Sequence, residues 1–218
     1  MDDLIWLSHN ISSFAICGEG NVSTRTDKGF LIKASGYDLK SITQNQFVEC
    51  DFNGEPLNRF DKRPSIETSF HSFLYQFPDV NFIAHSHPPN TLKILCSKYA
   101  KDFAKTRLFP DQVVRNGVKS CFVPYKTPGE DLKKELGFQI CYYYGEYGYI
   151  PQVILLQNHG IITTGKSAKE AYYGTMMCEK AADIYIGSKL LGQKKLSKTN
   201  IKDLTEMPQE NYRQNLIQ

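Results

Sequence analysis

The stretch Asn81-Phe82-Ile83-Ala84-His85-Ser86-His87-Pro88 carries the clearest structural signal in this chain. Its apolar run is typical of a buried strand, and residues two apart on a strand point to the same face. His85 and His87 therefore project side by side, about 6–7 Å apart at the backbone, from the end of a stiff element. Two neighbouring imidazoles are a common way to offer nitrogen ligands to a zinc-like ion.

A third histidine follows a second apolar run. The stretch Val153-Ile154-Leu155-Leu156-Gln157-Asn158-His159-Gly160 predicts a strand with His159 at its end. Three histidines on two strand ends match the pattern of a catalytic zinc with one open position. The alternative is that each histidine is an isolated polar residue near a strand end. The histidine pair together with His159 favours the metal site, which requires the two strands to be neighbours.

Composition limits the class of protein. The 218 residues are 41% hydrophobic and 22% charged, which predicts one globular domain over 1–218 with a polar tail from about 192 to 218. The net charge of +3 is spread along the chain, so we expect no nucleic-acid partner. We expect no membrane association either, because no apolar run approaches the ~20 residues that span a bilayer. The acidic N-terminus and six scattered cysteines favour a reducing, cytoplasmic location.

Helices and strands alternate irregularly, with hairpins among them. This pattern favours a mixed or antiparallel sheet covered by helices over a doubly wound parallel sheet. We expect a polar loop over 55–63 and a partly ordered arm from Gly192. The predicted helices cover 2–17, 64–76, 88–100, 128–143 and 167–191, and the predicted strands cover 22–25, 30–33, 47–51, 81–87, 120–124, 153–159 and 161–164.

Glu67 is the natural acid or base. It is predicted in the first turn of the helix that immediately precedes the histidine strand, so it can face the metal and either ligate it or act on a bound substrate. The alternative is a carboxylate that stabilises the helix N-terminus by about 0.3–1 kcal/mol. His71 lies four residues further on the same helix face, and we interpret it as structural.

Three short polar loops could bind an anion. They are Gly20-Asn21-Val22-Ser23, Ser35-Gly36, and Ser65 at a helix start. Backbone amides and hydroxyls at such places suit a phosphate group. Each loop alone is also an ordinary turn.

In chain order, the motifs are Gly-Asn-Val-Ser at 20–23, Ser-Gly at 35–36, Ser-x-Glu at 65–67, His-x-His at 85–87 and Asn-His-Gly at 158–160. This order resembles the class II aldolase/adducin family from about residue 10 to about 190. The resemblance implies a three-layer α/β/α fold with a mainly antiparallel central sheet, and a cyclic homotetramer. It implies Zn²⁺, or another divalent ion such as Mn²⁺, Co²⁺ or Fe²⁺, on His85, His87 and His159, with Glu67 on or near the ion. It also implies that Asn21, Ser35, Gly36 and Ser65 hold the phosphate of a sugar phosphate.

The function expected from this resemblance is cleavage of a ketose 1-phosphate to dihydroxyacetone phosphate and an aldehyde, through a zinc-stabilised enediolate with Glu67 carrying the proton. A pentulose-phosphate 4-epimerase, a sugar-phosphate dehydratase and a non-catalytic adducin-like module are the alternatives.

The chain also departs from the pattern of the family's fuculose-phosphate aldolases. Gly18 and Ile66 replace hydroxyl residues of the phosphate cradle, and Pro110-Asp111 falls where a tyrosine acts across the subunit boundary. Lys33 would restore affinity for an anion if its side chain turned inward. Asp111 is a candidate acid for the leaving aldehyde.

Overall fold

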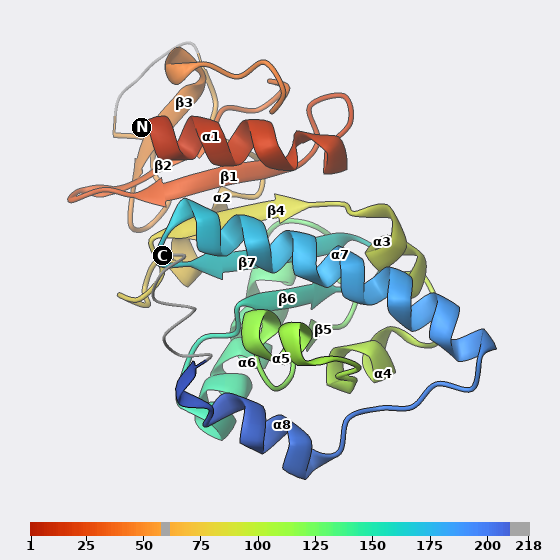
Figure 1. The fold of residues 1–218 in the computed structure, drawn as a ribbon. Helices are drawn as coiled ribbons and strands as arrows, with labels where there is room; N and C mark the ends of the chain where they lie inside the picture. Colours follow the sequence, from red (N-terminus) through yellow and green to blue (C-terminus); the bar gives the residue numbers. More distant parts are fainter. Residues whose placement is uncertain (58–61, 210–218) are drawn as a thin grey trace.

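A computed structural model describes residues 1–57 and 62–209. Seven strands form one open sheet in the order β3-β2-β1-β4-β7-β6-β5 (Figure 1). Every neighbouring pair is antiparallel except β5 and β6, which are parallel. The strands are β1 (Asn21–Arg25), β2 (Gly29–Lys33), β3 (Phe47–Asp51), β4 (Phe82–Ser86), β5 (Cys121–Val123), β6 (Val153–Leu156) and β7 (Gly160–Gly165). The expected mainly antiparallel sheet is confirmed, and the histidine strand β4 lies at its centre.

The central strands are apolar on both faces because helices cover the sheet from both sides. Ile83 of β4 belongs to one core and its neighbour Ala84 to another, as the two-residue period of a strand requires. Ile162 and Ile161 of β7 divide between two cores in the same way. The result is the expected three-layer α/β/α arrangement.

One helical layer consists of α2 (Thr68–Leu74) and α6 (Glu130–Tyr147). Phe70 and Leu74 of α2 pack in the same core as Leu136 and Ile140 of α6. The other layer contains α1 (Asp2–Ile11) and the long α7 (Ala168–Leu190), which crosses the front of the sheet in Figure 1. The shorter helices are α3 (Pro89–Leu95), α4 (Ala100–Lys105) and α5 (Pro110–Asn116), and short 3-10 turns cover Ser12–Phe14 and Gln44–Gln46.

Three predicted helices were too long. The helix expected over 2–17 ends at Ile11, and the one expected over 64–76 begins only at Thr68, because Pro64 pairs as an extended residue with Ala34. The helix expected over 88–100 stops at Leu95, since the Ser97 hydroxyl accepts from the Tyr99 amide and turns the chain towards α4. Of the loop expected over 55–63, residues 58–61 lie outside the described part. None of the helices over 1–57 and 62–209 is long and apolar enough to cross a membrane.

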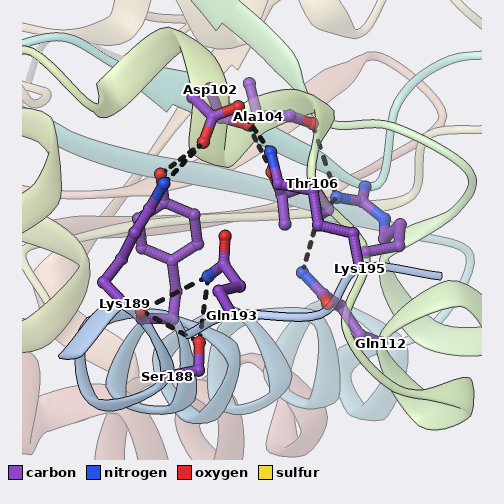
Figure 2. Close-up of polar contacts among 10 residues, drawn as sticks. Asp102, Ala104, Thr106, Gln112, Ser188, Lys189, Gln193 and Lys195 are labelled. Atoms are coloured by element: carbon purple, nitrogen blue, oxygen red, sulfur yellow. Dashed lines mark hydrogen bonds and ion pairs between the residues drawn. The ribbon is translucent and has the colours of Figure 1, made fainter. Parts of the chain in front are cut away.

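The segment after α7 packs back onto the molecule. Lys195 and Lys189 both contact the Asp102 carboxylate, at 2.7 and 3.3 Å, and the Gln193 amide donates to the Ser188 hydroxyl (Figure 2). The Leu196 amide donates to the Arg107 carbonyl. A further helix, α8 (Lys198–Thr205), follows. The expected polar arm is therefore anchored and partly helical as far as Thr205, while residues 210–218 lie outside the described part.

Candidate metal centre

His85 and His87 stand at one end of β4. His85 pairs with Asn21 of β1 on one side and with Ile162 of β7 on the other, and it is fully buried. His87 follows one residue after the strand, and its backbone amide donates to the Phe14 carbonyl. The two ring centroids are 4.9 Å apart, as predicted from the two-residue spacing.

His159 comes from the turn between β6 and β7, not from the end of a strand. The expected strand stops at Leu156, and Asn158 takes the left-handed conformation (φ 55°) that the tight turn requires. Because β7 pairs with β4, this turn lies beside the histidine pair. The His159 ring is 4.9 Å from the His85 ring and 5.6 Å from the His87 ring. The predicted neighbourhood of the three histidines is confirmed.

Glu67 also reaches this point. It is the residue before α2, not one of its first turn, and it is 7% exposed. Its Oε2 lies 3.2 Å from Nε2 of His85, and its Oε1 lies 3.2 Å from Nε2 of His159. The Glu67 amide is held by the Ser65 hydroxyl at 3.3 Å, so a short turn presents the carboxylate to the histidines.

The hydrogen bonds of the outer ring nitrogens fix the protonation of two histidines. Nδ1 of His85 is 2.9 Å from the Ile161 carbonyl, which can only accept, so this nitrogen carries the proton. Nδ1 of His87 is 3.2 Å from the Glu19 carboxylate, with the same consequence. Both Nε2 atoms are then bare lone pairs, yet they lie 3.2 Å apart, and that of His85 also lies 3.2 Å from Oε2 of Glu67. The bare nitrogens of His85 and His87 and a carboxylate oxygen thus converge here, which is an arrangement that a cation resolves.

Three contacts among the four side chains have the spacing of neighbouring ligands on a tetrahedral ion. Tetrahedral ligands about 2.0–2.1 Å from a zinc ion lie about 3.3–3.4 Å from one another. The contacts His85–His87, His85–Glu67 and His159–Glu67 are all 3.2 Å. One nitrogen from each histidine lies within 4.8 Å of the others. The residues present therefore suit a divalent ion on His85, His87 and His159, with Glu67 as a fourth ligand or as a neighbour of the open position.

The electrostatics agree with a cation site. Burial raises the pKa of Glu67, but the adjacent His85 and His159 and the hydrogen bond from Asn21 outweigh it, so the pKa is held below its usual range. Burial lowers the pKa of His85 to about 4. The carboxylate is thus ionised and the imidazole neutral at neutral pH, which are the forms that bind metals.

A buried chain of hydrogen bonds supports Glu67. The Asn21 side chain donates to Glu67 at 2.8 Å and accepts from Nε2 of His71 at 2.5 Å. Nδ1 of His71 then accepts from the Ser23 hydroxyl at 2.7 Å, and Ser23 accepts from Tyr75 at 2.6 Å. Because the Asn21 amide must donate to the carboxylate, every later bond has a fixed direction. The buried His71 ring bonds to Asn21 and Ser23, which agrees with its interpretation as a structural residue.

Sequence reasoning missed Glu19, Ser23 and Tyr75 as parts of this site. Their signal is weak: Glu19 is one acidic residue between glycines, and Ser23 and Tyr75 resemble ordinary strand and helix residues. Ser23 does belong to the Gly-Asn-Val-Ser motif, and Tyr75 stands four residues after His71, so helix spacing could have placed Tyr75 on the same side as that histidine.

The three loops predicted to bind an anion lie together. A Cβ on Gly18 would be 3.3 Å from the Gly36 carbonyl oxygen. The Ser35 amide donates to the Arg63 carbonyl, and the Ser65 amide to the Lys33 carbonyl, so the Ser35 and Ser65 segments run side by side.

Lys33 is buried and turned inward. Its ammonium donates to the Gly18 and Tyr37 carbonyls, both at 2.6 Å, and so ties two of the loops together. The Ile66 side chain is 79% exposed, and Asp111 lies in the first turn of α5, outside the four-donor cluster. The side-chain amide of Asn21 is occupied by Glu67 and His71.

The chain is similar to known proteins along most of its length. The sequence model of the class II aldolase and adducin N-terminal domain matches residues 11–186. L-fuculose phosphate aldolase of Methanococcus maripaludis is 28% identical over 172 residues, which are 78% of this chain and 86% of that protein. Methylthioribulose-1-phosphate dehydratase of Pseudoalteromonas translucida is 45% identical over 69 residues. That shorter match spans 31% of this chain and only 32% of the dehydratase.

The fold is also similar to a solved structure. YgbL of Escherichia coli superposes with a TM-score of 0.79 at 22% identity, over 93% of this chain and 96% of that one. At this identity the similarity concerns the fold alone. It agrees with the three-layer arrangement seen here.

Proposed function

Because the chain belongs to the class II aldolase and adducin family, we propose that it is a metal-dependent aldehyde-lyase that cleaves a ketose 1-phosphate into dihydroxyacetone phosphate and an aldehyde. The observation that carries the proposal is the convergence of His85, His87, His159 and Glu67 on one point. The similarity to an L-fuculose phosphate aldolase supports the same reaction class.

We propose Zn²⁺ as the ion, with Mn²⁺, Co²⁺ or Fe²⁺ as substitutes that the same ligands accept. Nε2 of each histidine would hold it, since the outer nitrogens of His85 and His87 are engaged elsewhere. A divalent ion at this place supplies a Lewis acid that polarises the substrate carbonyl, an effect of several kcal/mol.

Glu67 is the proton carrier in this proposal. Its carboxylate is ionised, nearly buried and aimed by Asn21, so it can take up the proton that the substrate hydroxyl loses as the carbon–carbon bond breaks, and deliver it to the carbon that loses the aldehyde. The buried chain through His71 keeps the carboxylate in one orientation. Loss of this carboxylate should therefore reduce turnover while the protein still folds.

We propose that Ser35, Gly36 and Ser65 hold the substrate phosphate. The two serine segments run side by side, and the Lys33 ammonium lies between the Gly18 and Tyr37 carbonyls of the adjoining loops. A fixed positive charge there compensates for the hydroxyls that Gly18 and Ile66 lack. Asn21, also predicted to contact the phosphate, has its side chain committed to Glu67 and His71. We therefore assign its side chain to the support of the carboxylate.

A sugar-phosphate dehydratase is the second candidate. The 45% identity with a methylthioribulose-1-phosphate dehydratase favours it, although the match is short. Its substrate would also be a ketose 1-phosphate, but Glu67 would then remove a proton beside the carbonyl while a hydroxyl leaves from the next carbon.

A panel of ketose phosphates separates these activities. The aldolase releases dihydroxyacetone phosphate, measured by NADH oxidation in a coupled assay, whereas a dehydratase gives a dicarbonyl product without triose phosphate. A product isomer without triose phosphate would instead identify a 4-epimerase, and either result would overturn the aldolase proposal. No turnover of any sugar phosphate by metal-loaded protein would favour the binding-module alternative.

Two variants test the roles of the residues. Glu67→Gln should keep the metal and lose turnover about 10²–10⁴-fold, while His85→Ala should lose the metal itself. Glu146→Gln, a surface carboxylate that pairs with Lys119, is the control for both. Full turnover in Glu67→Gln would remove that residue from the reaction.

We also propose that the protein is a homotetramer in the cytoplasm. Support for assembly comes from Trp6, Tyr173 and Met176, which expose large apolar side chains on α1 and α7. Support for a reducing compartment comes from the six cysteines, all of which are free thiols. Light scattering of the purified protein measures the mass and tests the tetramer.

A further inference from the structure

His87 is attached to the segment that precedes β1 by two separate contacts. Its backbone amide donates to the Phe14 carbonyl at 2.9 Å. Its Nδ1 donates to Oε2 of Glu19 at 3.2 Å. Both the position of the residue and the orientation of its ring therefore depend on the loop from Phe14 to Gly20.

The loop is shaped so that the Glu19 carboxylate faces inward. Cys17, Gly18 and Gly20 all have positive φ values, of 53°, 83° and 63°. Gly20 also packs so closely that a Cβ there would lie 2.8 Å from the His85 carbonyl oxygen. The Ile16 amide donates to the same Glu19 oxygen at 3.3 Å. The carboxylate is thus held by its own loop, and the loop is held against the histidine strand.

The three histidines differ in what holds their outer nitrogen. Nδ1 of His85 is held by the Ile161 carbonyl. This is a backbone group, so it does not depend on which side chain stands at position 161. Nδ1 of His159 is buried and has no hydrogen-bond partner among the residues that the structure describes. Within the same residues, Glu19 is the one side chain that orients a histidine of the cluster from outside it.

We propose that Glu19 is a positioning residue of the metal centre, which keeps the proton of His87 on Nδ1 and directs the bare Nε2 towards the ion. This inference rests on the metal site of the proposed function, but not on which sugar phosphate is the substrate. Carboxylates in this outer position raise the basicity of a ligating imidazole, and their loss commonly weakens metal binding about 10- to 100-fold. Because the Glu19 side chain is half exposed, water screens its charge, and the orientation of the ring should account for most of the effect.

Zinc affinity of the full-length protein tests the proposal directly, without a substrate. Competition with a chromogenic chelator should give a dissociation constant about 10- to 100-fold weaker in Glu19→Ala than in the wild type. Glu19→Gln should lose less, since its amide oxygen can still accept from Nδ1. Glu146→Ala is the matched control, because Glu146 is a similarly exposed carboxylate with a single cationic partner far from the histidines. It should bind zinc as the wild type does.

The protonation of the ring gives a second readout that a general loss of stability would not move. In the metal-free wild type, ¹⁵N-detected NMR should show the His87 proton on Nδ1, and Glu19→Ala should shift it towards Nε2. Equal zinc affinity in Glu19→Ala and Glu146→Ala, with the proton still on Nδ1, would overturn the role of Glu19 and leave the metal site intact. Failure of the wild type to bind zinc would overturn both, whereas zinc binding without aldolase activity would overturn only the proposed reaction.

Discussion

At the scale of single residues, Gly160 is the position on which the histidines pack. A Cβ placed there would lie 2.5 Å from Cδ2 of His87, 2.6 Å from the Ser86 carbonyl oxygen and 3.4 Å from Cε1 of His85. The first two distances are far below van der Waals contact, and one of them involves backbone that cannot swing aside. The Asn-His-Gly motif therefore ends in glycine because the adjacent strand and both rings occupy the space.

Gly160→Ala should consequently disturb the metal site without removing a ligand. We expect a loss of about 1–3 kcal/mol in the free energy of unfolding, as for other overpacked cores, together with weaker zinc binding. Urea unfolding and chelator competition measure the two effects.

Gly187→Ala provides the control for this substitution. A Cβ at Gly187, on helix α7, meets nothing within 4 Å, so the change should be neutral or stabilise the helix by about 0.5–1 kcal/mol. If Gly160→Ala matched that control in stability and in zinc affinity, close packing at Gly160 would not constrain the site.

Residues of the site could be predicted from sequence where the signal is local. His85 and His87 are two apart on one strand, so their spacing alone predicted that they converge. Glu19 and Asn21 meet His87 and Glu67 only because β1 pairs with β4, and this pairing depends on contacts distant in sequence. No local sequence pattern indicates that Glu19, a half-exposed glutamate between glycines, hydrogen-bonds to the ring of His87.

At the scale of elements, the positions of strands and hairpins were predicted well, and the ends of helices were not. The β1–β2 hairpin and β4 lie within a residue or two of the expected ranges, because turn residues and short apolar runs mark them. Helix ends depend on single hydrogen bonds, such as those of Ser97, that periodicity does not reveal. The polar segment from Gly192 offered no apolar period, yet ion pairs and a capping box at Ser197 order it.

Asp102 is the main anchor of that segment, which leads to a prediction about its exposure. Asp102→Asn would keep a partner for the Tyr185 hydroxyl but weaken the contacts of Lys189 and Lys195 (Figure 2). We expect trypsin to cut after Lys194 or Lys195 several times faster, with little change in melting temperature, because exposed ion pairs contribute under about 1 kcal/mol each.

Asp79→Asn is the control for this experiment, since it removes one ion pair, with Lys166, from an exposed carboxylate elsewhere. Its cleavage rate should match that of the wild type. Unchanged cleavage in Asp102→Asn would mean that the contacts of Gln193, Leu196 and α8 hold the segment without Asp102.

At the scale of the whole molecule, the strand order is the part of the fold that local patterns could not predict. The irregular alternation of helices and strands argued against a doubly wound parallel sheet. The resemblance to a family implied the three α/β/α layers. The position of β4 between β1 and β7, however, depends on pairing between segments distant in the chain. That order brings Asn21, His85 and His159 together at one end of the central strands, although they are far apart in the chain.

Two buried imidazoles should make the stability of the metal-free protein depend on pH. Burial lowers the pKa of His71 to about 3 and that of His85 to about 4, whereas an unfolded histidine has a pKa of about 6.5. Below pH 6.5 the unfolded chain therefore binds protons that the folded chain excludes. The free energy of unfolding should fall with pH by up to about 1.4 kcal/mol per pH unit for each histidine. Glu67 adds nothing above about pH 4.5, since its pKa is depressed from a value already near 4.3.

Urea titrations between pH 6.5 and 4.5, with a chelator present, measure this slope. His71→Gln should reduce it by the contribution of one histidine, in addition to any constant loss of stability. Identical slopes in the two proteins would show that His71 is not a neutral buried group.

Because His159 lies in the turn before β7, metal binding can report when β7 pairs with β4 during folding. The unfolded chain offers only the His-x-His pair as a local ligand set, because His159 is far away in sequence. The third nitrogen arrives when β7 pairs with β4, a contact between distant segments of the kind that forms slowly. During refolding in the presence of Co²⁺, the absorption band of the tetrahedral ion should appear when these two strands pair. The rate at which the band appears would therefore measure how fast the centre of the sheet assembles.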